Sequence, residues 1–91
     1  MLVSFTWDQR KALANVNKHG VSFEEAVTVF GDPFARVHAD TLDPERALLF
    51  GQSEKRRLLV VVFVEVNEDV TRIISARPTT SHERKHYEDD T

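Results

Sequence analysis

Cysteine is absent from this sequence of 91 residues. The chain therefore has no disulfide and no thiolate metal site, and it suits a reducing compartment. Long apolar runs are missing as well, because the longest, Leu58–Val64, is far shorter than the ~20 residues that cross a bilayer. The first residues lack the basic and apolar segments of a signal peptide. We therefore expect a cytoplasmic protein without membrane contact.

A strong charge of either sign is also missing. The formal net charge is −3, which argues mildly against a nucleic-acid-binding protein, because polyanions usually meet net positive surfaces. The charges are nevertheless uneven along the chain. Acidic residues gather at 65–69 and 88–90, and basic residues at 55–57. This distribution excludes a strongly basic protein and is compatible with a local cationic surface.

Length and composition indicate one domain covering residues 1–91. A hydrophobic content of 41% is ordinary for a globular protein and too high for a disordered chain. At this length the core is small, so a binding partner can contribute to stability. The sequence has no glycine-rich phosphate loop, paired acid motif or nucleophile motif built on serine or cysteine.

The first twenty residues predict a strand and a helix. Apolar and polar residues alternate over residues 3–7, as in a half-buried strand. Asp8 is a suitable N-cap for the helix, and Gly20 fits the left-handed position after its last residue. The apolar residues on one side of this helix are Ala12, Leu13 and Val16.

Residues 22–33 predict a second, short helix. Ser22-Phe23-Glu24-Glu25 has the pattern of a capping box. Apolar residues follow at the spacing of an amphipathic helix as far as Phe30. Gly31-Asp32-Pro33 then stops the helix.

The remaining residues predict four strands and a final helix. The expected strands are residues 34–39, 47–52, 57–66 and 70–77. The third of these is apolar in both parities, which is typical of a central strand covered on both faces. Thr80 and Glu83 form another capping box, which begins a helix that runs through about Glu88. The order β-α-α-β-β-β-β-α predicts an α+β fold, an antiparallel sheet with the helices on one side.

Four separated motifs carry a resemblance to a known family. They are Phe5-Thr6-Trp7-Asp8, Lys18-His19-Gly20-Val21, Arg72-Ile73-Ile74-Ser75-Ala76-Arg77 and Glu83-Arg84. From about Phe5 to Glu88 the chain closely resembles the BrnT family, the ribonuclease toxins of type II toxin–antitoxin systems. This resemblance implies a RelE-like fold, in agreement with the predicted order of strands and helices.

Lys18 and His19 are the first candidates for proton transfer. Histidine has an unperturbed pKa of ~6.5, which suits proton transfer near neutral pH. Both residues can equally serve only to stabilise the end of the first helix through its dipole. Because Lys-His-Gly-Val occupies the same place in BrnT-like toxins, the resemblance implies that His19 is the general acid or base.

Arginines at Arg46, Arg72 and Arg77 are candidates for binding a phosphate, which a guanidinium grips with two parallel hydrogen bonds. The alternative is that they pair with glutamates on neighbouring strands or remain solvated. On an unbroken strand, Arg72 and Arg77 face opposite sides of the sheet. Because Ser-Ala-Arg matches the family motif, we favour Arg77 for charge stabilisation, and we assign Arg57 and Arg72 to RNA binding.

The last helix contributes Glu83, Arg84 and Tyr87. Glu83 and Tyr87 are four residues apart and share a face, with Arg84 beside them. The resemblance implies that this helix flanks the active site, with Arg84 on a phosphate and Tyr87 packing or stacking on a base. Glu83 is then a base or a residue that orients an arginine. The structural alternative is that Glu83 caps the helix and Arg84 pairs with Glu88.

Three further histidines have structural interpretations. His82 and His86 have the spacing of two metal ligands, but no further ligand is evident, so we expect two solvated side chains, no metal and no cofactor. We expect His38 to be structural.

The resemblance implies a metal-independent endoribonuclease that uses a ribose 2′-OH to attack the adjacent phosphate. We expect His19, Arg46, Arg77 and Arg84 to converge in one exposed hollow. The family also implies a BrnA-like antitoxin with a ribbon-helix-helix domain, through which the complex binds operator DNA. One alternative is a catalytically silent module that keeps the antitoxin-binding surface. Another is a stand-alone DNA-binding protein, for which no recognition helix is visible.

Overall fold

A computed structural model describes residues 3–90, with the side chains of residues 3–88. Its elements are β1 (Ser4–Thr6), α1 (Gln9–His19), α2 (Phe23–Val29), β2 (Arg36–Ala39), β3 (Ala47–Gln52), β4 (Leu58–Asn67), β5 (Val70–Pro78) and α3 (Ser81–Asp90). This confirms the predicted α+β class and the predicted order. Within the described part of the chain, no helix has the length and apolar character needed to span a bilayer.

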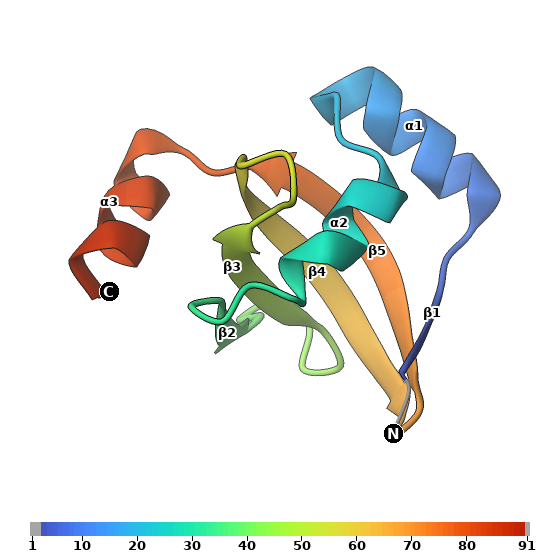
Figure 1. The fold of residues 1–91 in the computed structure, drawn as a ribbon. Helices are drawn as coiled ribbons and strands as arrows, with labels where there is room; N and C mark the ends of the chain where they lie inside the picture. The colour runs from blue at the N-terminus through green and yellow to red at the C-terminus, as the bar shows by residue number, and fades with distance from the viewer. Residues whose placement is uncertain (1–2, 91) are drawn as a thin grey trace.

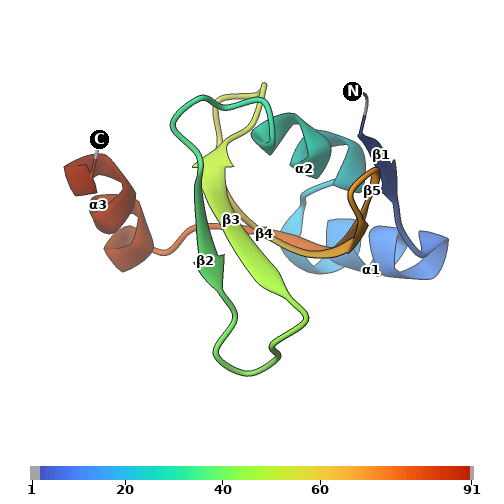
Figure 2. The same ribbon diagram turned by 90° about the horizontal axis from the view of Figure 1, so that it is seen from below.

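The five strands form one sheet in the order β1-β5-β4-β3-β2. Strands β2 to β5 are antiparallel neighbours, as predicted, whereas β1 pairs in parallel with β5. Helices α1 and α2 cover one face, which we call the inner face, and α3 lies on the other side, the outer face (Figures 1 and 2). The expectation of helices on one side is therefore wrong for α3. Its sequence is almost entirely polar, so it has no apolar stripe to bury in the core.

The hydrophobic core lies between the inner face and the first two helices. Its fully buried side chains include Val21, Phe23, Leu59 and Ile73. The half-buried Trp7 packs edge-on against Phe23, with 5.9 Å between the ring centroids, as expected for an aromatic anchor of the core.

The helix ends follow the local sequence signals. Asp8 accepts hydrogen bonds from the backbone amides of Arg10 and Lys11, and Gly20 takes the left-handed conformation at φ 70°. Thr80 and Glu83 form a complete capping box, because each side chain accepts a hydrogen bond from the other residue's amide.

Asn15 connects α1 to the sheet. Of the apolar residues expected on one side of α1, only Ala12 is buried, while Leu13 and Val16 are exposed. The second buried position of α1 belongs to Asn15, whose amide donates to the carbonyls of Val21 and Ala76. Its carbonyl oxygen accepts from the amide of Ala76 at 3.1 Å. A buried polar side chain thus fixes α1 against the last third of β5.

A β-bulge changes which side chains of β5 share a face. Ser75 pairs with Val62, but Ile73 pairs with the next residue, Phe63, so one extra residue lies in β5. Arg72 and Arg77 therefore both point to the outer face, and both are half-buried there. Their neighbours in sequence that point to the inner face are buried. The prediction that these arginines face opposite sides is wrong, because it assumed an unbroken strand.

Replacing Asn15 by Ala should lower the free energy of unfolding by about 3 kcal/mol, because it leaves buried backbone groups without hydrogen-bond partners. Asn17→Ala, at an exposed position of the same helix, is the matched control and should change stability by well under 1 kcal/mol. Urea unfolding followed by circular dichroism measures both values. Equal stabilities of the two variants would contradict the role assigned to Asn15.

Candidate active site

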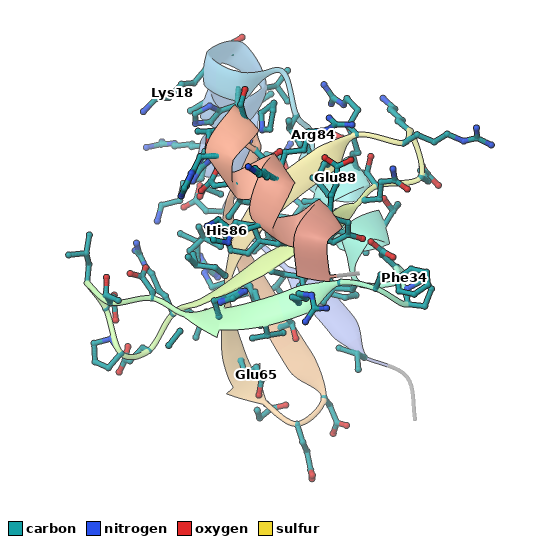
Figure 3. All side chains as sticks on the ribbon, turned by 90° about the vertical axis from the view of Figure 1, so that its left-hand side faces the viewer. Lys18, Phe34, Glu65, Arg84, His86 and Glu88 are labelled. Atoms are coloured by element: carbon teal, nitrogen blue, oxygen red, sulfur yellow. The ribbon has the colours of Figure 1, made fainter. Side chains whose placement is uncertain are left out.

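The two ends of the sheet carry opposite charges. We call the end where β5 stops and β3 turns into β4 the upper end. It carries Lys18, Lys55, Arg56, Arg57 and Arg77 together with the acidic Glu25, Glu54 and Glu83. The opposite, lower end carries Asp40, Asp43, Glu45, Glu65, Glu68 and Asp69 together with the basic Arg46. In Figure 3, Lys18, Arg84 and Glu88 lie towards one end and Glu65 towards the other. The upper end is therefore the more favourable of the two for a polyanion, even though the net charge is −3.

Arg77 and Glu83 form a two-pronged ion pair at the upper end, on the outer face. The guanidinium nitrogens of Arg77 donate to the two carboxylate oxygens of Glu83 at 2.8 and 2.9 Å. These hydrogen bonds, together with that from the Thr80 amide, lower the pKa of Glu83 to about 2 against the opposing effect of burial. Glu83 is consequently a carboxylate at neutral pH and a weak proton acceptor. Of the two roles expected for it, the geometry favours orienting Arg77.

Tyr87 provides a second polar link between α3 and the rest of the protein. Its hydroxyl donates to the carboxylate of Asp32 at 2.8 Å, in the loop between α2 and β2. Burial and the nearby Asp32 raise the pKa of Tyr87 to about 12, so the phenol stays neutral at physiological pH. Asp32 also accepts from the amides of Phe34 and Gln52, which fixes the position of this carboxylate.

A hollow of about 300 Å³ lies between α3 and the outer face of β2 and β3, and we call it the outer hollow. Its lining residues are Arg36, His38, Leu48, Phe50, Glu83, His86 and Tyr87. The imidazole of His38 stands edge-on to the ring of Phe50, with 5.1 Å between centroids. Glu83 and Tyr87 had been expected at the site on the predicted C-terminal helix, but the lining residues from the strands had not.

Sequence reasoning missed Arg36, His38 and His86 as members of this hollow. Arg36 pairs with Phe50 and His38 with Leu48 across β2 and β3, so all four side chains share the outer face. The alternation of residues along each strand indicates that Arg36 and His38 share one face of β2, and that Leu48 and Phe50 share one face of β3. It does not indicate how the two strands pair, and therefore which of these residues are neighbours.

The ends of α1 and of β5 approach each other at the upper end from opposite faces. The half-buried His19 and the exposed Lys18 end α1 on the inner side. Arg77 and α3 lie on the outer side. His19 therefore shares the upper end with Arg77 without sharing its face.

Arg57 serves a structural network rather than an open RNA-binding surface. Its guanidinium donates to the carboxylate of the buried Glu25, at 2.9 Å through Nε, and to the carbonyl of Gly20 at 3.0 Å. The buried Ser53 donates to the same carboxylate at 2.7 Å. The hydrogen bond with Arg57 is the largest cause of a lowered pKa of Glu25.

The remaining arginines do not meet at one point. Arg46 lies in the turn before β3 and pairs with Asp43 at 3.4 Å. In the sheet register, Arg46 is offset from Arg77 by four residues along the strand direction and by two strands. With about 3.4 Å per residue and 4.8 Å per strand, the backbones of the two arginines are roughly 17 Å apart. Arg72 lies on the outer face roughly 14 Å down β5 from Arg77, and the exposed Arg84 lies 3.6 Å from Glu88 on α3. None of His19, Arg46, Arg77 and Arg84 lines the outer hollow, and His19 lies on the other face of the sheet from Arg77. The expectation that these four residues converge in one exposed hollow is therefore wrong.

His82 and His86 are the pair on α3 with the spacing of metal ligands. His82 and His86 stack edge to face with 4.7 Å between their centroids. Among the side chains that the structure describes, no group of three or more histidine or acidic residues could hold a metal ion.

A second surface lies on the inner face, below the end of α2, and we call it the apolar groove. Its volume is about 540 Å³, and its lining includes Val3, Phe5, Phe30, Val37, Phe63 and Glu65. Val3 and Val37 are 49% and 63% exposed, so apolar surface is open to solvent here. The β4–β5 turn beside it bears Glu68 and Asp69.

These features define a small α+β domain with a cationic sheet end and a hollow under its last helix. The family described as ribonuclease toxin, BrnT, of type II toxin–antitoxin system matches residues 7–83, so the chain belongs to the BrnT family. Its fold is similar to that in the crystal structure of the Brucella abortus ribonuclease toxin BrnT, with a TM-score of 0.72 and 22% sequence identity. That likeness covers 87% of this chain and 99% of the Brucella chain. No curated protein sequence matches significantly.

Nuclear magnetic resonance of the side-chain carboxyl carbons should show Glu83 titrating near pH 2. Because this pKa is lowered on folding, the ion pair stabilises the protein above about pH 4.3, the unfolded value, and the stabilisation is lost as the pH falls towards 2. Arg77→Ala should return the titration of Glu83 towards about 4.3, whereas the control Arg84→Ala should leave it unchanged. A wild-type midpoint near 4 would rule out the ion pair.

Arg57→Ala should reduce the free energy of unfolding at pH 7 by about 2 kcal/mol, because it leaves the buried Glu25 carboxylate unpaired while Arg57 itself is partly solvated. Since the pKa of Glu25 is lowered on folding, this difference should shrink as the pH falls below about 4.3. Lys55→Ala, in the same hairpin, is the control and should have little effect. Denaturant unfolding at pH 7 and pH 3 measures both variants. A penalty that does not depend on pH would argue against the pair.

Proposed function

We propose that this BrnT-family ribonuclease toxin is a metal-independent endoribonuclease whose scissile phosphate binds beside Arg77 at the upper end. The observation that carries the proposal is the position of Arg77. Its guanidinium is oriented by Glu83 and lies between the cations of the upper end and the outer hollow. A fixed cation at this place stabilises the negative charge that develops on the non-bridging oxygens. In the reaction, the ribose 2′-oxygen bonds to phosphorus as the bond to the 5′-oxygen breaks. The products are a 2′,3′-cyclic phosphate and a 5′-hydroxyl.

The reaction needs one group to accept the 2′-OH proton and another to protonate the leaving 5′-oxygen. We assign one of these transfers to His19, with Lys18 as a neighbouring cation, because both lie at the upper end. Arg77 and Arg84 neutralise the phosphate, and Arg72 is available further down β5 for an adjacent phosphate. Tyr87 packs or stacks beside the site. The RNA then bends over the upper end, since His19 and Arg77 approach it from opposite faces.

A type II toxin has an antitoxin partner. We propose that this partner is BrnA-like, with a ribbon-helix-helix domain that carries the complex to operator DNA. The apolar groove supports the presence of a binding partner, because exposed valines surround it and Glu65 lies in its lining. A partner segment that suits it has an apolar face and basic flanking residues.

Induced expression in a host without the antitoxin tests the activity. We expect growth arrest and fragments of total RNA that end in 2′,3′-cyclic phosphates. Chelation with EDTA should leave cleavage by the purified protein unchanged. Normal growth with intact RNA, together with tight antitoxin binding, would instead identify a catalytically silent module.

His19→Ala should reduce cleavage by about 10²–10⁴-fold, the usual contribution of general acid–base catalysis, and Arg77→Ala by about 10²–10³-fold. His82→Ala is the histidine control. Arg46→Ala is the arginine control, because Arg46 lies at the lower end. Circular dichroism and thermal melting verify that each variant folds. If His19→Ala cleaves at the wild-type rate, His19 is not a proton-transfer group.

A further inference from the structure

We propose that the outer hollow binds a single unpaired purine base of the RNA, next to the phosphate that Arg77 holds. This inference rests on the proposed function and adds to it a site for base recognition. No residue assigned to proton transfer lies in the lining of the hollow.

The lining has the chemistry that unpaired bases require. Four of its seven residues carry rings, namely His38, Phe50, His86 and Tyr87. Unpaired bases stack on aromatic and imidazole rings, at about 1–3 kcal/mol for each base. The volume of about 300 Å³ is at the small end of the range for ligand pockets, which is about 300–1,000 Å³. The hollow therefore suits one flat ring system rather than a folded oligonucleotide.

Two polar links hold the hollow open. The ion pair of Glu83 with Arg77 fixes the first turn of α3, and the hydrogen bond of Tyr87 with Asp32 fixes the second. An almost entirely polar helix has no apolar side chains with which to fill the space above β2 and β3. The hollow persists because α3 is attached by these links instead of by close packing.

The position of the hollow relative to Arg77 fits one nucleotide. Arg36, Phe50, Val60 and Arg77 form a single row across four strands on the outer face. Two strand spacings, roughly 10 Å, separate the backbones of Phe50 and Arg77. Glu83 lines the hollow and contacts Arg77 directly, so the base site and the phosphate site share a wall.

A purine fits this lining better than a pyrimidine because its wider ring system covers more of the aromatic surface that the lining offers. The same base chemistry is present in a free nucleotide and in an RNA chain. We assign the site to RNA because the cations of the upper end are available to several phosphates.

The test is the affinity for 2′-fluoro RNA, which lacks the attacking hydroxyl and cannot be cleaved. Fluorescence anisotropy compares labelled hexamers that carry at one position guanine, adenine, cytosine, uracil or no base. We expect the purine hexamers to bind about tenfold more tightly than the hexamer with no base, and free GMP to bind more weakly than any hexamer. Leu48→Trp fills the hollow and should remove the difference between bases. Leu42→Trp, at a position 92% exposed in the β2–β3 turn, is the control and should keep it.

Several results would overturn the inference. One is a base preference that Leu48→Trp leaves unchanged, and another is equal binding with and without the base. A preference for pyrimidines overturns the purine assignment, and tighter binding of GMP than of RNA overturns the RNA assignment. If Leu48→Trp does not fold, His38→Ala is the test variant in its place. Its control is Val37→Ala, because Val37 is next to His38 in β2 but faces the other side of the sheet. Loss of RNA cleavage with intact base-dependent binding would reject the proposed function alone.

Discussion

The ion pair between Arg77 and Glu83 determines whether the outer face has a site at all. One carboxylate caps α3, pairs with Arg77 and forms a wall of the outer hollow. Because α3 is almost entirely polar, the hydrophobic effect contributes little to its attachment. The orientation of the proposed phosphate ligand therefore depends on these two hydrogen bonds, and the hollow depends on them together with the hydrogen bond of Tyr87 with Asp32.

A related arrangement supports the other side of the upper end. Ser22 accepts a hydrogen bond from the amide of Glu25, as in a capping box, but the Glu25 side chain extends to Arg57 and Ser53. In both cases a glutamate in the first turn of a helix binds an arginine that lies at the upper end of a strand. The hairpin between β3 and β4, the end of α1 and the start of α3 are thus fixed at the upper end by hydrogen bonds that these two arginines donate. Such hydrogen bonds are stronger than those between neutral groups because the donor is ionised.

Local signals predicted most of the fold, and non-local register accounts for what they could not predict. The caps at Asp8, Ser22 and Thr80 depend on residues within one helical turn, so the sequence contains the necessary information. The bulge that places Arg72 and Arg77 on one face depends on how β5 pairs with β4. The burial of Asn15 likewise depends on the backbone of β5, and an apolar-periodicity argument selects Leu13 and Val16 instead.

The candidate site shows the same division. The resemblance to BrnT toxins placed Arg77, Glu83, Arg84 and Tyr87 near one another, and the structure has Arg77 in contact with Glu83 and Glu83 lining a hollow with Tyr87. Arg46 was included as an arginine at the start of a predicted strand, and its place in the β2–β3 turn separates it from the others. The partners of the predicted residues, from β2 and β3, depend on strand pairing and had no local signal.

Charge segregation reconciles an acidic protein with a polyanionic substrate. The acidic residues of the two lower turns are at the opposite end of the sheet from the basic residues of the upper end. Distance and salt therefore weaken their repulsion of RNA bound at the upper end, because the screening length is about 8 Å at physiological ionic strength. The same acidic end borders the apolar groove. A partner with basic flanks is therefore attracted to the end that repels RNA, and the two ligands approach different surfaces of one small domain. The net charge of −3 is a total over the whole chain, and the local charge of each surface, not this total, determines what binds there.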